Sequence, residues 1–256
     1  MNVTVYKLKS QKAKEKLRIA LVSDLHDNSA EKVLEELKKL SPDIIAIPGD
    51  LTSRLDLLDG EPSHDKMGTV SHKNAFWLLS EASKLAPTYY SFGNHELCGH
   101  NYKKNFGHRC HEKNSADIKK SGALLIDDEY TVKDGIAIGG LTTGHTNADL
   151  TPHTGWLDGF SARREYKILL CHHPEDYEKY LKHRDIDLIL SGHAHGGQIR
   201  LFGRGLFAPG QGVLPKYTSG VHEKRFVISR GLANTVGMIP RLFNPTEIVL
   251  VEINPD

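Results

Sequence analysis

The sequence predicts an α/β fold in which two β-sheets pack face to face with helices on the outside. Residues 18–48 read as a strand, a helix and a second strand, which is typical of a βαβ unit with a right-handed crossover. The second half holds a denser run of short apolar strands with fewer helices, an order that favours two packed sheets. Polar side chains directly follow five of the apolar runs, as they do where parallel strands end at one edge.

The first half alternates strands and helices. Residues 3–8 alternate apolar and polar side chains and predict an edge strand. Residues 29–40 carry apolar side chains at helical spacing, with Ser29 as the expected N-cap. The other elements expected here are strands over 18–22, 43–48 and 88–92 and helices over 74–85 and 114–120.

The second half predicts mostly strands. They are expected over 123–126, 129–132, 136–140, 168–171, 187–190, 198–202, 226–229 and 247–252. A helix over 174–183 stands among them. Residues 54–70 and 98–112 are polar and aperiodic, so we expect two long loops there.

The length of 256 residues allows one large domain or two small ones, and one domain over residues 1–256 is favoured because the candidate site draws on side chains from both halves. The 33 Lys and Arg nearly balance 32 Asp and Glu, so the net charge of +1 gives no strong nucleic-acid signal. Three cysteines do not make a disulfide framework. With no apolar run near the ~20 residues of a spanning helix and no signal-peptide core, we expect a cytoplasmic protein. The Lys-rich stretch 7–16 could make a peripheral contact with anionic lipid, although a solvated face is the favoured interpretation.

The five strand ends carry Asp, Asn and His, which together suit a divalent transition metal. The residues are Asp24 and His26, Asp50, Asn94 with His95, His172, and His193 with His195. One residue separates the members of the Asp24/His26 and His193/His195 pairs, so an extended backbone would turn each pair to one face. Two cations ~3.5–4 Å apart would need a bridging carboxylate, for which Asp50 is the candidate.

In this combination and order the motifs resemble the calcineurin-like metallophosphoesterase family over nearly the whole chain. Residues 191–198, 229–232 and 241–245 resemble a bacterial, membrane-associated branch that includes enzymes acting on lipid-linked or nucleotide-sugar diphosphates. The resemblance implies a four-layer αββα sandwich of two mixed sheets. It implies one metal on Asp24, His26, Asp50 and His195, and a second on Asp50, Asn94, His172 and His193. His95 would not be a ligand and would stabilise the transition state or protonate the leaving group.

The implied function is metal-dependent hydrolysis of a phosphate ester or diphosphate bond by metal-activated water. Two divalent ions are implied, with Mn²⁺ favoured and Fe, Zn²⁺ or Co²⁺ as alternatives. The substrate would be a small or lipid-linked phosphorylated molecule. A phosphodiesterase or nuclease on the same fold and a non-catalytic metal-binding scaffold are the alternatives. Protein phosphatases of the family carry a second Asp and then Arg-Gly where this chain has Ser53-Arg54-Leu55, which argues against that activity.

Several residues near the motifs stay open. Arg230 precedes a glycine after a strand and could bind a phosphate oxygen, cap carbonyls or pair with an acid. Glu96 could orient His95. Because His172 and His173 are neighbours, an extended backbone would let at most one of them face the metals; His172 is the expected ligand, and His173 should support the site or be structural. Asp27 could support the site or be solvated.

The remaining candidates have plainer interpretations. Cys171, Trp156 and Phe160 are expected in the core. Cys98, His100, His108, Cys110 and His111 share one predicted loop, where a zinc site, substrate contact or no role are the alternatives.

Overall fold

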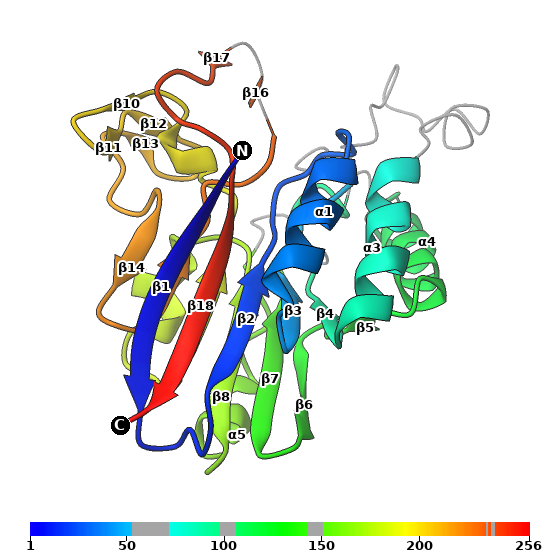
Figure 1. Cartoon of the computed structure of the whole chain (residues 1–256), viewed down its shortest axis with the longest axis vertical. Helices are drawn as coiled ribbons and strands as arrows, with labels where there is room; N and C mark the ends of the chain where they lie inside the picture. The colour runs from blue at the N-terminus through cyan, green and yellow to red at the C-terminus, as the bar shows by residue number, and fades with distance from the viewer. Residues whose placement is uncertain (53–71, 98–105, 143–150, 234, 237–238) are drawn as a thin grey trace.

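The protein forms four layers, with helices on the outside of two β-sheets (Figure 1). The structure is a computed structural model that describes residues 1–52, 72–97, 106–142, 151–233, 235–236 and 239–256. Each main sheet has six strands, and parallel and antiparallel neighbours occur in both. This arrangement confirms the predicted αββα sandwich.

The first sheet has the order β1-β18-β2-β3-β4-β5. Its strands are β1 (Asn2–Ser10), β18 (Glu247–Pro255), β2 (Leu17–Leu21), β3 (Ile44–Ile47), β4 (Thr88–Tyr90) and β5 (Leu124–Leu125). β2 to β5 run parallel, whereas β18 is antiparallel to β2. β1 lies at the edge beside β18, as its alternating sequence predicts.

The second sheet has the order β14-β15-β9-β8-β7-β6. Its strands are β14 (Gly220–His222), β15 (Phe226–Ile228), β9 (Leu188–Ser191), β8 (Tyr166–Cys171), β7 (Ile136–Leu141) and β6 (Glu129–Lys133). The four central strands are parallel, and antiparallel strands close both edges.

Strand alternation divides the core into layers. Ile19 and Leu21 point into the space between the sheets, whereas Ala20 and Val22 face the outer helices. The helices α1 (Glu31–Leu40), α3 (Lys73–Leu85) and α4 (Phe106–Lys120) belong to the first sheet's side (Figure 1). The short α5 (Leu157–Ser161) and the π-helical turn η1 (Tyr177–Leu181) pack on the second sheet. Among the described residues, none of the helices combines the length and apolar composition needed to cross a bilayer.

Four local expectations are wrong. Ala30, not Ser29, is the N-cap of α1, and the Ser29 hydroxyl instead donates to Glu31 (2.6 Å). The helix expected over 174–183 is only the turn η1. The loop expected over 98–112 is helical from Phe106 onward. The strand expected over 198–202 is reduced to two residues. The loop expected over 54–70 lies outside the described residues.

Short hairpins lie at the end toward which β2 points (Figure 1). They are built from β10 (Arg200–Leu201), β11 (Arg204–Gly205), β12 (Phe207–Ala208), β13 (Gly212–Val213), β16 (Thr235–Val236) and β17 (Ile239–Pro240). The carboxyl ends of the parallel strands meet at this end, so it is where a site should form.

Candidate metal centre

The predicted ligand residues follow five strands of the two sheets. Asp24 and His26 follow β2, Asp50 follows β3 and Asn94 follows β4, all in the first sheet. From the second sheet, His172 follows β8, and His193 and His195 follow β9. The centre therefore lies across the shared edge of both sheets.

Four groups of side chains place their potential ligand atoms within 4.8 Å of one another. The groups are Asp24/His26/His195, Asp24/Asp50/His172, His26/Asp50/His95 and His172/His173/His193. Because they share members, they form one continuous cluster. Every predicted Asp and His ligand is in it, and Asn94 touches it through His173.

Asp50 lies at the middle of the cluster. Its Oδ2 is 3.0 Å from His172 Nε2, 3.8 Å from His95 Nε2 and 4.0 Å from His26 Nε2. Its Oδ1 accepts the backbone N–H of His95 (2.9 Å). One carboxylate thus has imidazole nitrogens from three strand ends around a single oxygen.

His172 presents Nε2 to the centre. Its Nδ1 is 2.9 Å from the Pro48 carbonyl, to which it can donate. Its Nε2 is close to Asp50 but is not aligned for a hydrogen bond and has no such partner. In a neutral ring this arrangement leaves the Nε2 lone pair free, as in many metal-binding histidines.

Asp24 and two histidines make the other half of the cluster. His195 Nε2 is 3.5 Å from Asp24 Oδ1 and 3.4 Å from His26 Nε2. The Asp24 carboxylate is fixed by the Ser23 hydroxyl (2.5 Å) and by the backbone N–H of His193 (3.0 Å).

The backbone is strained at five of the predicted ligands. The φ angles of Asp24, His26, Asp50, His193 and His195 are 56°, 48°, 54°, 64° and 45°. Left-handed backbone costs a non-glycine residue ~1–3 kcal/mol and concentrates at functional sites. The local strain therefore supports a functional role for these loops.

The loops after β3 and β4 touch through glycines. Gly49 has φ 108°, and a Cβ there would lie 2.3 Å from the backbone nitrogen of Gly93. Only glycine permits this approach, which brings Asp50 beside Asn94 and His95.

Burial keeps most of the imidazoles neutral. It lowers the pKa of His26 to about 3 and lowers the pKa values of His193 and His195 well below their usual range. A neutral imidazole is the form that binds a metal.

The two carboxyl groups respond differently to burial. Burial, joined by the charge of Asp50, raises the pKa of Asp24 to about 6. Burial also favours the neutral form of Asp50, but His172, His95 and His26 outweigh it and lower the pKa well below the usual range. In the same way, Asp50 overcomes burial and raises the pKa of His172 to about 9. A cation could replace the proton in this pair, so the donor set fits divalent metals.

His173 also faces the centre, contrary to the expectation from strand alternation. β8 ends at Cys171, so the two histidines that follow do not alternate as strand residues would. His173 Nε2 lies 3.2 Å from Asn94 Oδ1, and its ring centroid is 4.1 Å from that of His193. His173 is therefore placed to orient Asn94.

Glu96 makes no hydrogen bond or ion pair with His95 in the described structure and instead joins the loops after β3 and β4. Its buried carboxylate accepts backbone N–H groups of Asp50 (2.9 Å), Gly93 (2.9 Å) and Thr52 (3.1 Å). It also accepts the hydroxyls of Thr52 (3.0 Å) and Tyr90 (2.8 Å). These five bonds join the loops that carry Asp50 and His95.

Arg230 pairs with an acid, one of its three expected alternatives. Its Nη2 donates to Glu247 Oε2 (2.6 Å), and its backbone N–H donates to Oε1 (2.9 Å). Asp27 supports the fold, because its carboxylate accepts the N–H of Ala75 in the first turn of α3 (2.9 Å).

The plainer expectations have mixed outcomes. Cys171 and Phe160 are buried in the outer core of the second sheet, as expected, and Trp156 packs against that core. Cys98 and His100 lie outside the described residues, as do the side chains of His108 and Cys110. His111 Nε2 lies 2.6 Å from Asp127 Oδ2.

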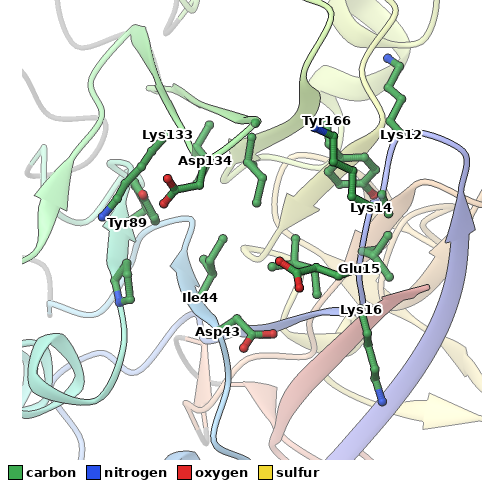
Figure 2. Close-up of a pocket in the computed structure, with 17 residues that line it drawn as sticks. Lys12, Lys14, Glu15, Lys16, Asp43, Ile44, Tyr89, Lys133, Asp134 and Tyr166 are labelled. Atoms are coloured by element: carbon green, nitrogen blue, oxygen red, sulfur yellow. The ribbon is translucent and has the colours of Figure 1, made fainter. Parts of the chain in front are cut away.

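A cavity of about 400 Å³ lies at the other end of the strands (Figure 2). Leu17, Ile44 and Tyr166, which begin β2, β3 and β8, contribute to its lining. It is thus separate from the His/Asp cluster at their carboxyl ends.

Proteins similar in sequence to this chain include two uncharacterized metallophosphoesterases. The metallophosphoesterase Cj0846 of Campylobacter jejuni is 28% identical over 249 residues, covering 94% of this chain and 60% of that protein. YkoQ of Bacillus subtilis is 29% identical over 255 residues, covering 94% and 85%. A transmembrane protein with a metallophosphoesterase domain from Danio rerio is 27% identical over 195 residues, covering 72% and 41%. The chain thus spans less than two thirds of the first and third of these relatives.

Among solved structures, a novel archaeal phosphodiesterase has a TM-score of 0.38 and 15% identity, covering 88% of this chain and 90% of that one. The model of the calcineurin-like phosphoesterase family matches residues 17–197, a span that includes Asp24, Asp50, Asn94 and His195. With the His/Asp cluster inside that span, the chain belongs to the calcineurin-like phosphoesterase family.

Proposed function

We propose that this chain hydrolyses a phosphate ester or diphosphate bond at a centre of two divalent metals. Asp24, His26, Asp50 and His195 would hold one metal, and Asp50, Asn94, His172 and His193 the other. The central position of Asp50 carries the proposal, because its carboxylate belongs to two of the four donor groups and lies against three imidazoles.

Two bound cations would lower the pKa of a coordinated water and neutralise charge on the phosphoryl oxygens. The chain's own residues fix the geometry. Pro48 holds the His172 ring by its carbonyl, and Ser23 and the His193 N–H hold the Asp24 carboxylate. Such supporting contacts orient ligands and raise metal affinity.

His95 would act on the leaving group. Its backbone is tied to Asp50, whereas its side chain is 26% exposed and its Nε2 faces the cluster. A proton held at Nε2 can pass to the departing oxygen as the ester bond breaks, which is general acid catalysis.

Mn²⁺ is the proposed metal, with Fe, Zn²⁺ and Co²⁺ as alternatives that the same His, Asp and Asn donors accept. A small or lipid-linked phosphorylated molecule is the proposed substrate class. A phosphodiester substrate, including nucleic acid, is the alternative to test beside it.

The experiment uses the full chain, stripped by a chelator and then loaded with Mn²⁺. Hydrolysis of p-nitrophenyl phosphate and bis-p-nitrophenyl phosphate should appear with the metal and disappear after chelation. The variant Asp50→Asn should lose at least about a hundredfold in kcat/KM and bind less than the expected two metals per chain. Asp134→Asn, an exposed acid at the other end of the strands, is the matched control.

Two results would overturn the proposal. One is the absence of turnover with Mn²⁺, Fe²⁺, Zn²⁺ and Co²⁺ on both substrates. The other is equal activity of Asp50→Asn and the parent chain. Metal bound at two per chain without turnover would instead favour the scaffold alternative.

A further inference from the structure

Three loops near the metal centre each expose a pair of neighbouring apolar side chains. The pairs are Leu201-Phe202, Val213-Leu214 and Leu242-Phe243, with exposed fractions of 45% and 103%, 76% and 70%, and 46% and 80%. Single exposed apolar residues are ordinary, but six on three loops that contact one another indicate an interaction site. We call these six residues the apolar crown.

Backbone contacts bring the three loops together. The loop of Leu242 lies beside that of Leu201, because Arg200 N–H donates to the Leu242 carbonyl (3.0 Å). Leu206 joins the loop of Leu201 to the loop of Leu214, because its N–H donates to the Ile199 carbonyl (2.9 Å) and its carbonyl accepts the Leu214 N–H (2.9 Å). The hairpins of the crown lie at the end of the molecule toward which β2 points (Figure 1).

Three of the six crown residues have an unusual backbone conformation. Phe202, Leu214 and Phe243 have φ angles of 51°, 53° and 52°. Left-handed backbone is rare for bulky side chains and tends to mark functional positions. Each of the three loops therefore holds one large apolar side chain outward in an unfavourable conformation.

The surroundings of the crown are cationic. Residues 188–247 contain seven Lys and Arg against two acidic residues, Glu223 and Glu247, of which Glu247 pairs with Arg230, although the whole chain has a net charge of only +1. A groove of about 400 Å³ beside Leu214 is lined by Arg200, Arg204 and Lys216, and none of the described residues lining it is acidic. Lys216 pairs with Glu178 (2.5 Å), whereas Arg204 makes no ion pair within the described part of the chain.

We propose that the crown docks the protein on an anionic lipid bilayer. The apolar pairs would enter the boundary between headgroups and acyl chains, and the groove with Arg204 would receive an anionic headgroup. A bilayer suits three separate protruding loop tips better than a second copy of the chain, whose identical cationic surface would repel this one.

Docking there would place the metal centre close to the headgroups. Asn244, next to Phe243 in the chain, donates from Nδ2 to the carbonyl of His195 (2.7 Å). The crown is thus connected directly to a predicted ligand loop. Bilayer binding does not require the proposed hydrolysis, so either can fail without the other.

The Lys-rich stretch 7–16 is a weaker candidate for the same role. Lys12 pairs with Asp187 (3.0 Å) and Lys16 with Glu252 (2.8 Å). Their charges are partly neutralised, and the exposed apolar residues before this stretch, Met1, Val3 and Val5, are only 46%, 37% and 47% exposed.

The test is co-sedimentation of the full, Mn²⁺-loaded chain with vesicles of phosphatidylcholine, alone or mixed with phosphatidylglycerol. The parent chain should sediment with the mixed vesicles. Phe202→Ser/Leu214→Ser/Phe243→Ser should lower the partition coefficient at least about tenfold.

Arg204→Gln should weaken binding to the mixed vesicles and reduce its dependence on salt. Leu124→Ser/Val132→Ser, which removes two apolar side chains of 49% and 40% exposure elsewhere, should bind like the parent.

Phe202→Ser alone guards against a folding artefact, because that side chain is fully exposed. It should lower vesicle binding while its thermal unfolding matches the parent's. The proposal is overturned if the parent does not sediment with mixed vesicles or if the triple variant sediments equally. A third result would also overturn it. The parent would be a dimer by light scattering, the crown variants would be monomers, and no protein would sediment with the vesicles.

Discussion

Glu96 shows how one buried charge can set the geometry of a site without belonging to it. Four donors from two loops and the Tyr90 hydroxyl of β4 converge on its carboxylate; three of the five are backbone N–H groups and two are hydroxyls. Hydrogen bonds to a charged acceptor are stronger than neutral ones, and a buried acceptor has no water to replace them. The positions of Asp50 and His95 therefore depend on Glu96.

We predict that Glu96→Gln destabilises the fold by about 2–3 kcal/mol and lowers metal affinity. The amide would turn an NH₂ group toward donors, leaving N–H groups of Asp50, Gly93 or Thr52 without an acceptor. Urea unfolding and metal titration measure the two effects. Glu112→Gln changes an exposed acid and should change neither. Parent-like stability in Glu96→Gln would contradict the structural role.

At the residue scale, the sequence predicts most of the His/Asp cluster but not the contacts of His173 and Glu96 that hold it. Asp24, Asp50 and His172 stand out because each directly follows an apolar run. For His173, an extended backbone predicts a side chain that points away from the cluster, but the backbone beyond β8 does not alternate as a strand does, and the side chain supports Asn94 from within the cluster. Two of the partners of Glu96, Asp50 and Thr52, lie 46 and 44 residues away in the chain, so no local signal reveals them.

At the scale of elements, β8 is tied to its surroundings by a buried lysine. The Lys167 side chain is fully buried, and its Nζ donates to the carbonyls of Ser161 (3.0 Å) and Arg163 (3.1 Å) and to Asp185 (2.7 Å). It thereby satisfies carbonyls at and just beyond the end of α5. One residue connects a strand, a helix end and the turn before β9.

We expect Lys167→Met to destabilise the fold by about 2 kcal/mol, because the two carbonyls and the Asp185 carboxylate lose their donor. Thermal unfolding by circular dichroism would measure it. Lys179→Met, an exposed lysine on η1, serves as the control and should unfold like the parent. If both variants unfold like the parent, water replaces the ammonium group, and the hydrogen bonds of Lys167 do not contribute to stability.

The junction of the loops after β3 and β4 gives a second prediction for an element. Gly49→Ala would place a Cβ against the Gly93 backbone at a φ angle of 108°. The loops must separate, so we expect metal affinity to fall at least about tenfold and stability by about 1–3 kcal/mol. Gly135→Ala is the matched control, because its φ is also positive (78°) and its Cβ would meet nothing within 4 Å. Equal losses in both variants would mean that backbone strain, and not loop contact, is responsible.

The elements that sequence predicted are those with strong local patterns. β2, α1 and β3 were recognised because branched apolar runs flank an amphipathic segment. The two-residue strands β10 to β13 are too short for any periodicity to appear. α4 was recognised only in its last half, because its first residues are polar and resemble a loop.

At the scale of the whole molecule, the free energy of unfolding should depend on buried acids outside the cluster. Asp176 is 8% exposed, and burial, followed by the charge of Glu175, raises its pKa from 3.8 to about 7. The folded state therefore holds this proton up to a higher pH than the unfolded state does. The stability that results is complete below about pH 4 and is lost as the pH rises through 7.

Asp176→Asn cannot ionise, so we predict that it gains stability relative to the parent as the pH rises. From pH 5 to pH 8 the difference in unfolding free energy should shift toward the variant by about 1–3 kcal/mol. Urea unfolding of both proteins across this range measures it, and metal binding largely cancels because both carry the same cluster. Asp134→Asn, an exposed acid, should show a flat difference. A flat difference for Asp176→Asn as well would mean that the carboxyl titrates alike in both states, and that its burial is relieved by water.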